Sequence, residues 1–159
     1  MTEKNQIKER GPGPFMASIY IILFLIIGAG LSITIYKKYF ALPAAKVNAT
    51  KTIHAQTVKY ISGELDKCNL NETSIMNNTV MCSEINSTNV IQAALILLKD
   101  KNPFDHVKNS VRQADSNTND EDVGYVSLSS SGSNIIIKSC NKTPCKKEEN
   151  RKQSTVSIK

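Results

Sequence analysis

The chain has no tryptophan, and aromatic residues make up only 6% of its 159 positions. Aromatic side chains supply much of the apolar area in a protein core, so we expect a small core. A zinc site is not expected, because neither His54 nor His106 lies near a cysteine pair and no Cys-x-x-Cys spacing occurs. The composition therefore points to a small domain with no bound cofactor.

Sequence signatures of common catalytic sites are also missing. There is no Gly-x-Ser-x-Gly elbow and no Gly-Lys-Ser/Thr phosphate loop. His54 falls in an expected helix and His106 in an expected loop, so each is interpreted as structural or solvent-exposed. We expect no enzymatic activity and no small-molecule substrate.

Charge is absent from residues 15–36, which form one apolar run. A helix of that length spans about 33 Å at about 1.5 Å per residue, enough for the hydrocarbon core of a bilayer. The run exceeds the roughly 7–15 apolar residues of a cleaved signal peptide, which favours a retained transmembrane helix. We expect a cytoplasmic lead at 1–14, the transmembrane helix at 15–36 and an extracytoplasmic domain at 37–159.

The orientation of this anchor is inferred from the cysteines, because lysines flank the run on both sides. All four cysteines follow the run, and an even number in a small domain suits two disulfides in an oxidising compartment. We therefore expect the N-terminus in the cytoplasm and the domain in the periplasm or outside the cell. Four cysteines allow three connectivities, of which Cys68–Cys82 and Cys140–Cys145 are favoured because each closes a short loop. Four unpaired buried thiols are the alternative.

The remaining sequence predicts an α+β fold with a small antiparallel sheet. Apolar residues recur every three or four positions over 44–67, which predicts an amphipathic helix that continues the membrane helix as one long helix. A second helix is expected at 88–99, capped by Ser87 or Thr88. Strands are expected near 79–82 and at 125–129, 134–138 and 154–158, whereas 105–122 is expected to be irregular.

The order of these segments resembles a type IV pilin or pilin-like protein. The local likeness lies in the stretch leading into the head, in a Lys-Asn-Pro-Phe element before the sheet, and in a β-hairpin followed by a cysteine: residues 44–51, 99–104, 123–128, 131–137 and Cys140. The resemblance implies a long N-terminal helix packed on an antiparallel sheet. It does not extend to the N-terminus, where Gly11 and Gly13 precede prolines and the run lacks the family's glutamate.

The resemblance implies a major or minor structural subunit of a surface filament that serves adhesion, motility, DNA uptake or secretion. Its partners would be copies of itself or other pilin subunits, joined through the N-terminal helix within the inner membrane and the filament. Gly28-Ala29-Gly30 places small residues where helices can approach closely. The alternative is a single-pass, signal-anchored extracytoplasmic domain that binds a ligand without polymerising.

An acidic stretch offers one candidate metal site. Its oxygen-bearing side chains begin with the Asp-x-Asn-x-Asn pattern of a calcium loop: Asp115, Asn117, Asn119, Asp120 and Asp122. The pattern then fails, because Asp120 stands at the glycine position and Val126 at the position of the bidentate glutamate. We expect a solvated loop, with a weak calcium site as the alternative.

The C-terminal part is rich in cations: Lys142, Lys146, Lys147, Arg151, Lys152 and Lys159. These side chains can contact DNA phosphates or an acidic surface ligand. Glu148 and Glu149 interrupt the series, which favours a solubilising surface instead.

Overall fold

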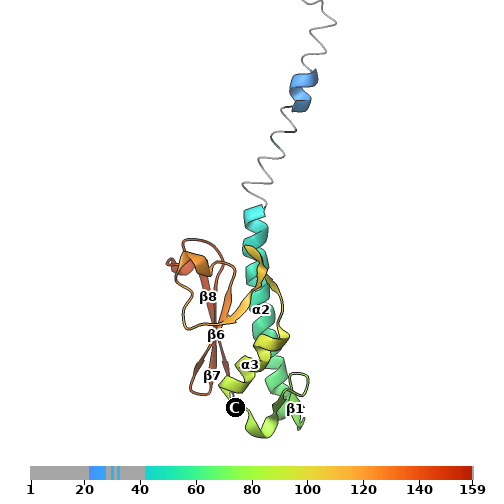
Figure 1. Ribbon diagram of the computed structural model, residues 1–159, viewed down its shortest axis with the longest axis vertical. Helices are drawn as coiled ribbons and strands as arrows, with labels where there is room; N and C mark the ends of the chain where they lie inside the picture. The colour runs from blue at the N-terminus through green and yellow to red at the C-terminus, as the bar shows by residue number, and fades with distance from the viewer. Residues whose placement is uncertain (1–21, 28–29, 31, 33–41, 159) are drawn as a thin grey trace, which may run out of the picture. The chain divides into compact units, whose positions relative to one another are not determined.

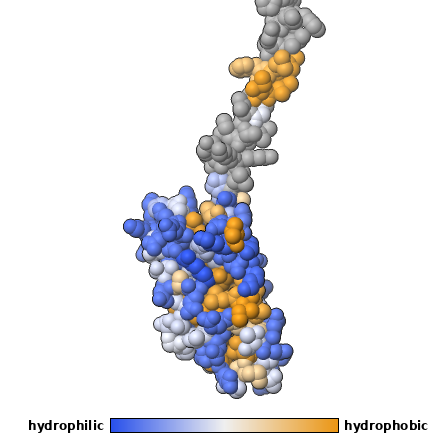
Figure 2. All heavy atoms as spheres, viewed as in Figure 1, coloured by the Kyte–Doolittle hydropathy of each residue, from blue (hydrophilic) through white to orange (hydrophobic). Residues whose placement is uncertain are grey.

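The computed structural model describes residues 22–27, 30, 32 and 42–158, and the chain divides into two units, Met1–Leu42 and Pro43–Lys159 (Figure 1). In the first unit, residues 22–27, 30 and 32 are helical. The side chains of Ile22 to Ile27 are 49–80% exposed, and Figure 2 shows them as an apolar segment. The rest of the expected 15–36 helix, and its junction with the next helix, lie outside the described residues. Among the residues described, no helix has both the length and the apolar character needed to cross a membrane.

The second unit begins with helix α2, Leu42–Asn69, which confirms the helix expected at 44–67. One face of α2 is buried, because its apolar positions follow the helical period. Ile53, Ile61 and Leu65 on this face belong to the core, while Lys51 and Lys59 are exposed. The same face also buries four polar residues, Thr50, His54, Thr57 and Glu64.

A small hairpin and a second helix follow α2. Strands β1, Ser74–Ile75, and β2, Val80–Met81, form the hairpin, and a short 3₁₀ helix, η2, spans Cys82–Glu84. The second helix, α3, covers Ser87–Leu97. Its cap is Asn86, whose side chain accepts a hydrogen bond from the Asn89 amide at 2.9 Å. The expected cap was therefore wrong, because the Ser87 hydroxyl instead donates to the Gly132 carbonyl at 3.0 Å.

Residues 105–122 are more regular than the sequence predicts, although residues 114–119 form neither helix nor strand. Strand β3, Lys101–Asn102, pairs with β4, Asp105–Asn109, and strand β5, Val111–Gln113, joins the main sheet. A 3₁₀ helix, η3, spans Asp120–Asp122. β3 and β5 are short, and β5 pairs in parallel with β6 and not in a local hairpin, so local alternation does not reveal them.

The main sheet has four strands in the order β5-β6-β7-β8. Strands β6, Val126–Ser131, β7, Asn134–Cys140, and β8, Arg151–Ser157, pair antiparallel, which confirms the three-stranded core of the prediction. A 3₁₀ helix, η4, at Glu148–Asn150 leads into β8. The expectation of a purely antiparallel sheet was wrong at one edge, where β5 pairs parallel with β6.

The core lies between one face of this sheet and the two helices, which run alongside it in Figure 1. The sheet contributes Leu128, Ile135 and Ile137, all fully buried. Helix α2 contributes Ile61, and α3 contributes Ile91. The second unit is thus an α+β domain. The helices cover one face of its main sheet, here called the inner face, and the other is called the outer face.

Candidate functional site

The acidic segment that precedes β6 is fixed to the outer face of the sheet by Asn117, whose side chain is buried. The Asn117 amide group donates to the carbonyl of Tyr125 at 3.0 Å and to the carbonyl of Lys138 at 3.1 Å. Its Oδ1 atom accepts hydrogen bonds from the Ser127 hydroxyl and from Arg112. Asn117 therefore joins the segment to β5, β6 and β7, while five of the eight residues from Asp115 to Asp122 are exposed, as expected of a solvated loop.

Arg112 lies at the centre of a second set of contacts on this face. Its guanidinium group forms an ion pair with the buried carboxylate of Asp122. It also lies over the Tyr125 ring, 4.0 Å from the ring centroid, in a cation–π contact. Asp122 in turn accepts a hydrogen bond from the Asn119 amide at 2.8 Å, completing a capping box for η3. The ion pair compensates for the burial of the Asp122 charge.

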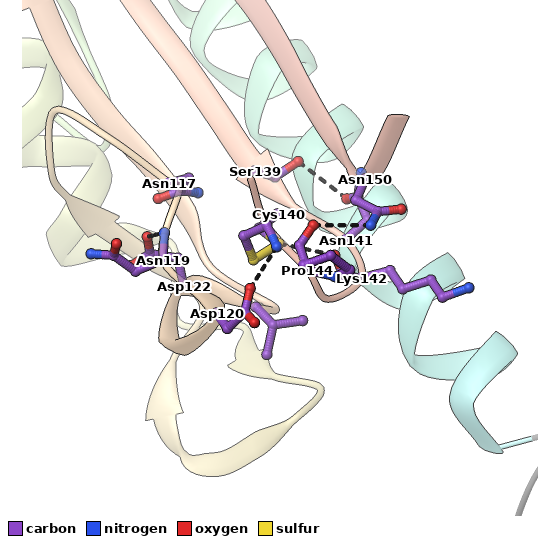
Figure 3. Close-up of a disulfide and its surroundings, with 12 residues drawn as sticks. Asn117, Asn119, Asp120, Asp122, Ser139, Cys140, Asn141, Lys142, Pro144 and Asn150 are labelled. Carbon is purple, nitrogen blue, oxygen red and sulfur yellow. Dashed lines mark hydrogen bonds between the residues drawn. A yellow bond between two sulfur atoms is a disulfide. The ribbon is translucent and has the colours of Figure 1, made fainter. Parts of the chain in front are cut away.

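A disulfide loop is attached to this segment. The structure pairs Cys140 with Cys145 and Cys68 with Cys82, the two links favoured from the sequence. The Cys145 amide donates to Oδ1 of Asp120 at 2.7 Å, so the Cys140–Cys145 loop contacts η3 (Figure 3). Segments about 25 residues apart in sequence thus form one structural unit at the end of β7.

The calcium candidates occupy this unit, but their oxygen atoms already accept protein hydrogen bonds. The Asp115 carbonyl accepts from Nζ of Lys138 at 2.8 Å, and the side chains of Asn117, Asp120 and Asp122 accept from the groups named above. In the described part of the chain, no group of three His, Cys, Asp or Glu residues is placed to hold a metal ion. A calcium ion would have to displace these donors, so the geometry gives the calcium hypothesis no support.

The two histidines lie on different elements. His54 on α2 is fully buried, and its Nε2 atom lies 2.9 Å from the hydroxyl of Ser154 on β8. Burial, with a smaller effect of the nearby Lys152 charge, lowers the pKa of His54 from 6.5 to about 4. His106 lies exposed on β4 rather than in a loop. His54 therefore joins the helix to the edge strand in its neutral form.

The C-terminal cations are divided between two faces of β8. Arg151 pairs with Cys140 across the ladder, and Lys152 pairs with Ser139, so their side chains point to opposite faces. Lys142, Lys146 and Lys147 are exposed near the disulfide loop, and Lys159 lies outside the described residues. The DNA-contact hypothesis remains a prediction, and these placements do not gather the cations on one surface.

A polar pocket of about 300 Å³ opens between the acidic segment and strands β7 and β8. Six of the residues that line it supply side chains of mixed polarity: Ser116, Thr118, Lys138, Glu148, Arg151 and Gln153. No sequence pattern predicts this pocket, because its walls meet only when Asn117 fixes residues 116–118 against β7.

Comparisons with known proteins give no further guide to the role of this site. No protein-family model, no curated protein and no solved structure matches the chain. The interpretation therefore rests on the fold and on the residues themselves.

Proposed function

We propose that the chain is a structural subunit of a type IV pilus-like surface filament. The observation that carries the proposal is α2, a 28-residue helix whose inner face packs in the core of an α+β head. In the sequence, α2 follows the apolar residues of 15–36 after the short stretch 37–41. A helix that leads from an apolar segment into a compact head suits a subunit that bundles through its N-terminal part and exposes its head.

Bundling would use the apolar residues of the first unit. The described side chains from Ile22 to Ile27 carry no charge and are exposed in that unit. Gly28-Ala29-Gly30 follows them in the sequence, and small residues let apolar helices pack closely. The partners would be copies of this chain or related subunits.

The proposed location follows from the same features. Two disulfides in the head suit an oxidising compartment, which favours a periplasmic or extracellular head and a cytoplasmic N-terminus. The first unit would hold the chain in the inner membrane until assembly. In this proposal the role is mechanical and adhesive rather than catalytic.

The test is to shear cells that produce the chain and to determine its N-terminus by mass spectrometry in the sheared and membrane fractions. The proposal expects a chain trimmed near Gly11 or Gly13 in sheared filaments. Gly30→Leu should reduce its recovery in filaments while its membrane level stays constant, because a large side chain separates packed helices. Gly63→Leu is the matched control, since a Cβ atom at Gly63 meets no atom within 4 Å.

An intact Met1 found in washed membranes, with none of the chain in the sheared fraction, would contradict the proposal. That result would favour a single-pass anchored domain that binds a ligand as one copy.

A further inference from the structure

The polar pocket beside the acidic segment has cationic groups on one wall. Lys138 on β7 pairs with Gln153 on β8, and Cys140 pairs with Arg151, so Lys138 and Arg151 lie on the same sheet face. Lys138 is held in place by its 2.8 Å hydrogen bond to the Asp115 carbonyl. Lys152 also lines the pocket, and Glu148, from η4, supplies the one carboxylate among the described residues that line it.

Arg151 is half-buried and lines this pocket. Its Nε atom is buried and has no hydrogen-bond partner among the described residues. A carboxylate in the pocket matches the planar guanidinium group of Arg151 in shape and charge.

The other lining groups indicate what the rest of such a ligand would be. Ser116, Thr118 and Gln153 offer neutral polar groups that suit hydroxyl groups, and Glu148 can accept from a hydroxyl group. The same Glu148 carboxylate disfavours a ligand with two negative charges, such as a phosphate monoester. A volume of about 300 Å³ lies at the small end of ligand pockets and suits one sugar ring.

We propose that this pocket binds a sugar residue that carries a carboxylate, with the carboxylate at Arg151 and Lys138. The walls are formed in advance, because Asn117 fixes residues 116–118 and the Cys140–Cys145 link closes the adjacent loop. Walls that are already ordered reduce the entropy lost on binding. The pocket lies within the unit Pro43–Lys159, so binding does not depend on filament assembly.

The experiment titrates the full chain, kept in detergent, with glucuronate, glucose, acetate and inorganic phosphate by isothermal titration calorimetry. Glucuronate should bind at least about tenfold more tightly than the other three, because only it offers both the carboxylate and the hydroxyl groups. A glucuronate-terminated disaccharide tests whether the ligand is the end of a glycan or a free sugar acid. If the disaccharide binds more tightly than glucuronate, the site recognises a glycan end. If it binds more weakly, the site recognises the free acid. Either order supports the proposal.

Arg151→Gln should weaken glucuronate binding by about tenfold or more, since a charge-assisted hydrogen bond is lost. The matched control is Lys142→Gln, which removes the same charge from an exposed residue that does not line the pocket and should change affinity less than about twofold. Lys138→Gln is the second variant, should Arg151→Gln fail to fold in a thermal unfolding assay.

Three results would overturn the proposal. If glucose bound as tightly as glucuronate, the carboxylate would contribute nothing to binding. If phosphate or acetate bound as tightly as glucuronate, the pocket would be a simple anion site. The third is a short DNA duplex that binds more tightly than glucuronate and loses affinity equally in Arg151→Gln and Lys142→Gln, because the ligand would then contact a general basic surface and not the pocket.

Discussion

His54 of α2 and Ser154 of β8 lie 100 positions apart in the sequence, yet Nε2 of the histidine is 2.9 Å from the serine hydroxyl. The histidine is fully buried, and its Nδ1 atom has no hydrogen-bond partner among the described residues. Lys152, two residues before Ser154, lies on the same face of β8. A proton added to His54 would therefore bring an uncompensated charge into the contact between helix and sheet.

The first prediction concerns stability in mild acid. The pKa of His54 is lowered from 6.5 to about 4 in the folded protein, so folding favours the neutral ring. The resulting stability is fully present above about pH 6.5, falls as the pH drops, and is lost below about pH 4. The loss should approach roughly 3 kcal/mol at about 1.4 kcal/mol per pKa unit. Urea unfolding between pH 4 and pH 7 measures it.

Two variants and the choice of pH range separate the contribution of His54 to the pH dependence of stability from that of Glu64. His54→Gln should flatten the stability curve between pH 6.5 and 4.5, whereas His106→Gln should leave it unchanged because His106 is exposed. Burial raises the pKa of Glu64, but hydrogen bonds from Lys67 and the Met76 amide outweigh burial and lower it below 4.5. Stability from Glu64 is present above about pH 4.5 and is lost as the pH falls through its lowered folded pKa. An unchanged slope in His54→Gln would contradict the assignment.

The second prediction concerns Gly124, at the junction between the β3–β4 hairpin and the sheet. Gly124 has a φ of +81°, and a Cβ atom there would lie 2.0 Å from Oδ1 of Asn102. Asn102 cannot easily move, because it donates to the Val123 carbonyl at 3.1 Å and accepts from the Phe104 amide at 2.8 Å. Gly124→Ala should therefore cost about 3–5 kcal/mol in the free energy of unfolding.

Gly132→Ala is the matched control for backbone strain. Gly132 also has a positive φ, +59°, but a Cβ atom there meets nothing within 4 Å. Its cost should be about 1–2 kcal/mol, the conformational penalty alone. Equal losses in the two variants would show that the contact with Asn102 contributes nothing.

The third prediction compares the two disulfides. In the loop-entropy description, the Cys68–Cys82 link, with a separation of 14, contributes about 3 kcal/mol, and the Cys140–Cys145 link, with a separation of 5, about 2 kcal/mol. Replacing each pair by serines and measuring urea unfolding gives the two values. A larger loss from the shorter loop would show that its contact with Asp120, rather than chain entropy, determines its contribution.

The regular elements of the head could be predicted because their signals are local. The apolar period of α2 and the β-branched run Ile135–Ile137 each identify one element without reference to the rest of the chain. The favoured cysteine pairs were likewise close in sequence. Local signals therefore identified α2, α3 and the three antiparallel strands.

The candidate site could not be predicted, because its contacts join segments that the sequence separates. Asp115 to Asp122 has the composition of a solvated loop, and only the positions of Arg112, Tyr125 and Lys138 in the fold turn it into an ordered wall. Likewise, β5 has three residues and is stabilised by its parallel partner. Arg151 and Lys152 lie on opposite faces of β8, but which face each occupies is known only from the register of β8 with β7.

The last prediction concerns Asn117, which fixes that wall. Asn117→Ala removes both hydrogen bonds to the Tyr125 and Lys138 carbonyls and leaves the Ser127 hydroxyl without its acceptor. We expect a loss of about 2–4 kcal/mol in the free energy of unfolding, since several buried polar groups lose partners together. Hydrogen exchange should also accelerate in residues 114–123 while α2 remains protected.

Asn119→Ala is the control for this variant. Asn119 is exposed and serves as the cap of η3, so its loss should cost about 1 kcal/mol. If the two variants were equally destabilised, the buried amide of Asn117 would not be what holds the segment to the sheet. Faster exchange in α2 as well would mean that the substitution opens the whole head, because the wall and the core would then unfold together.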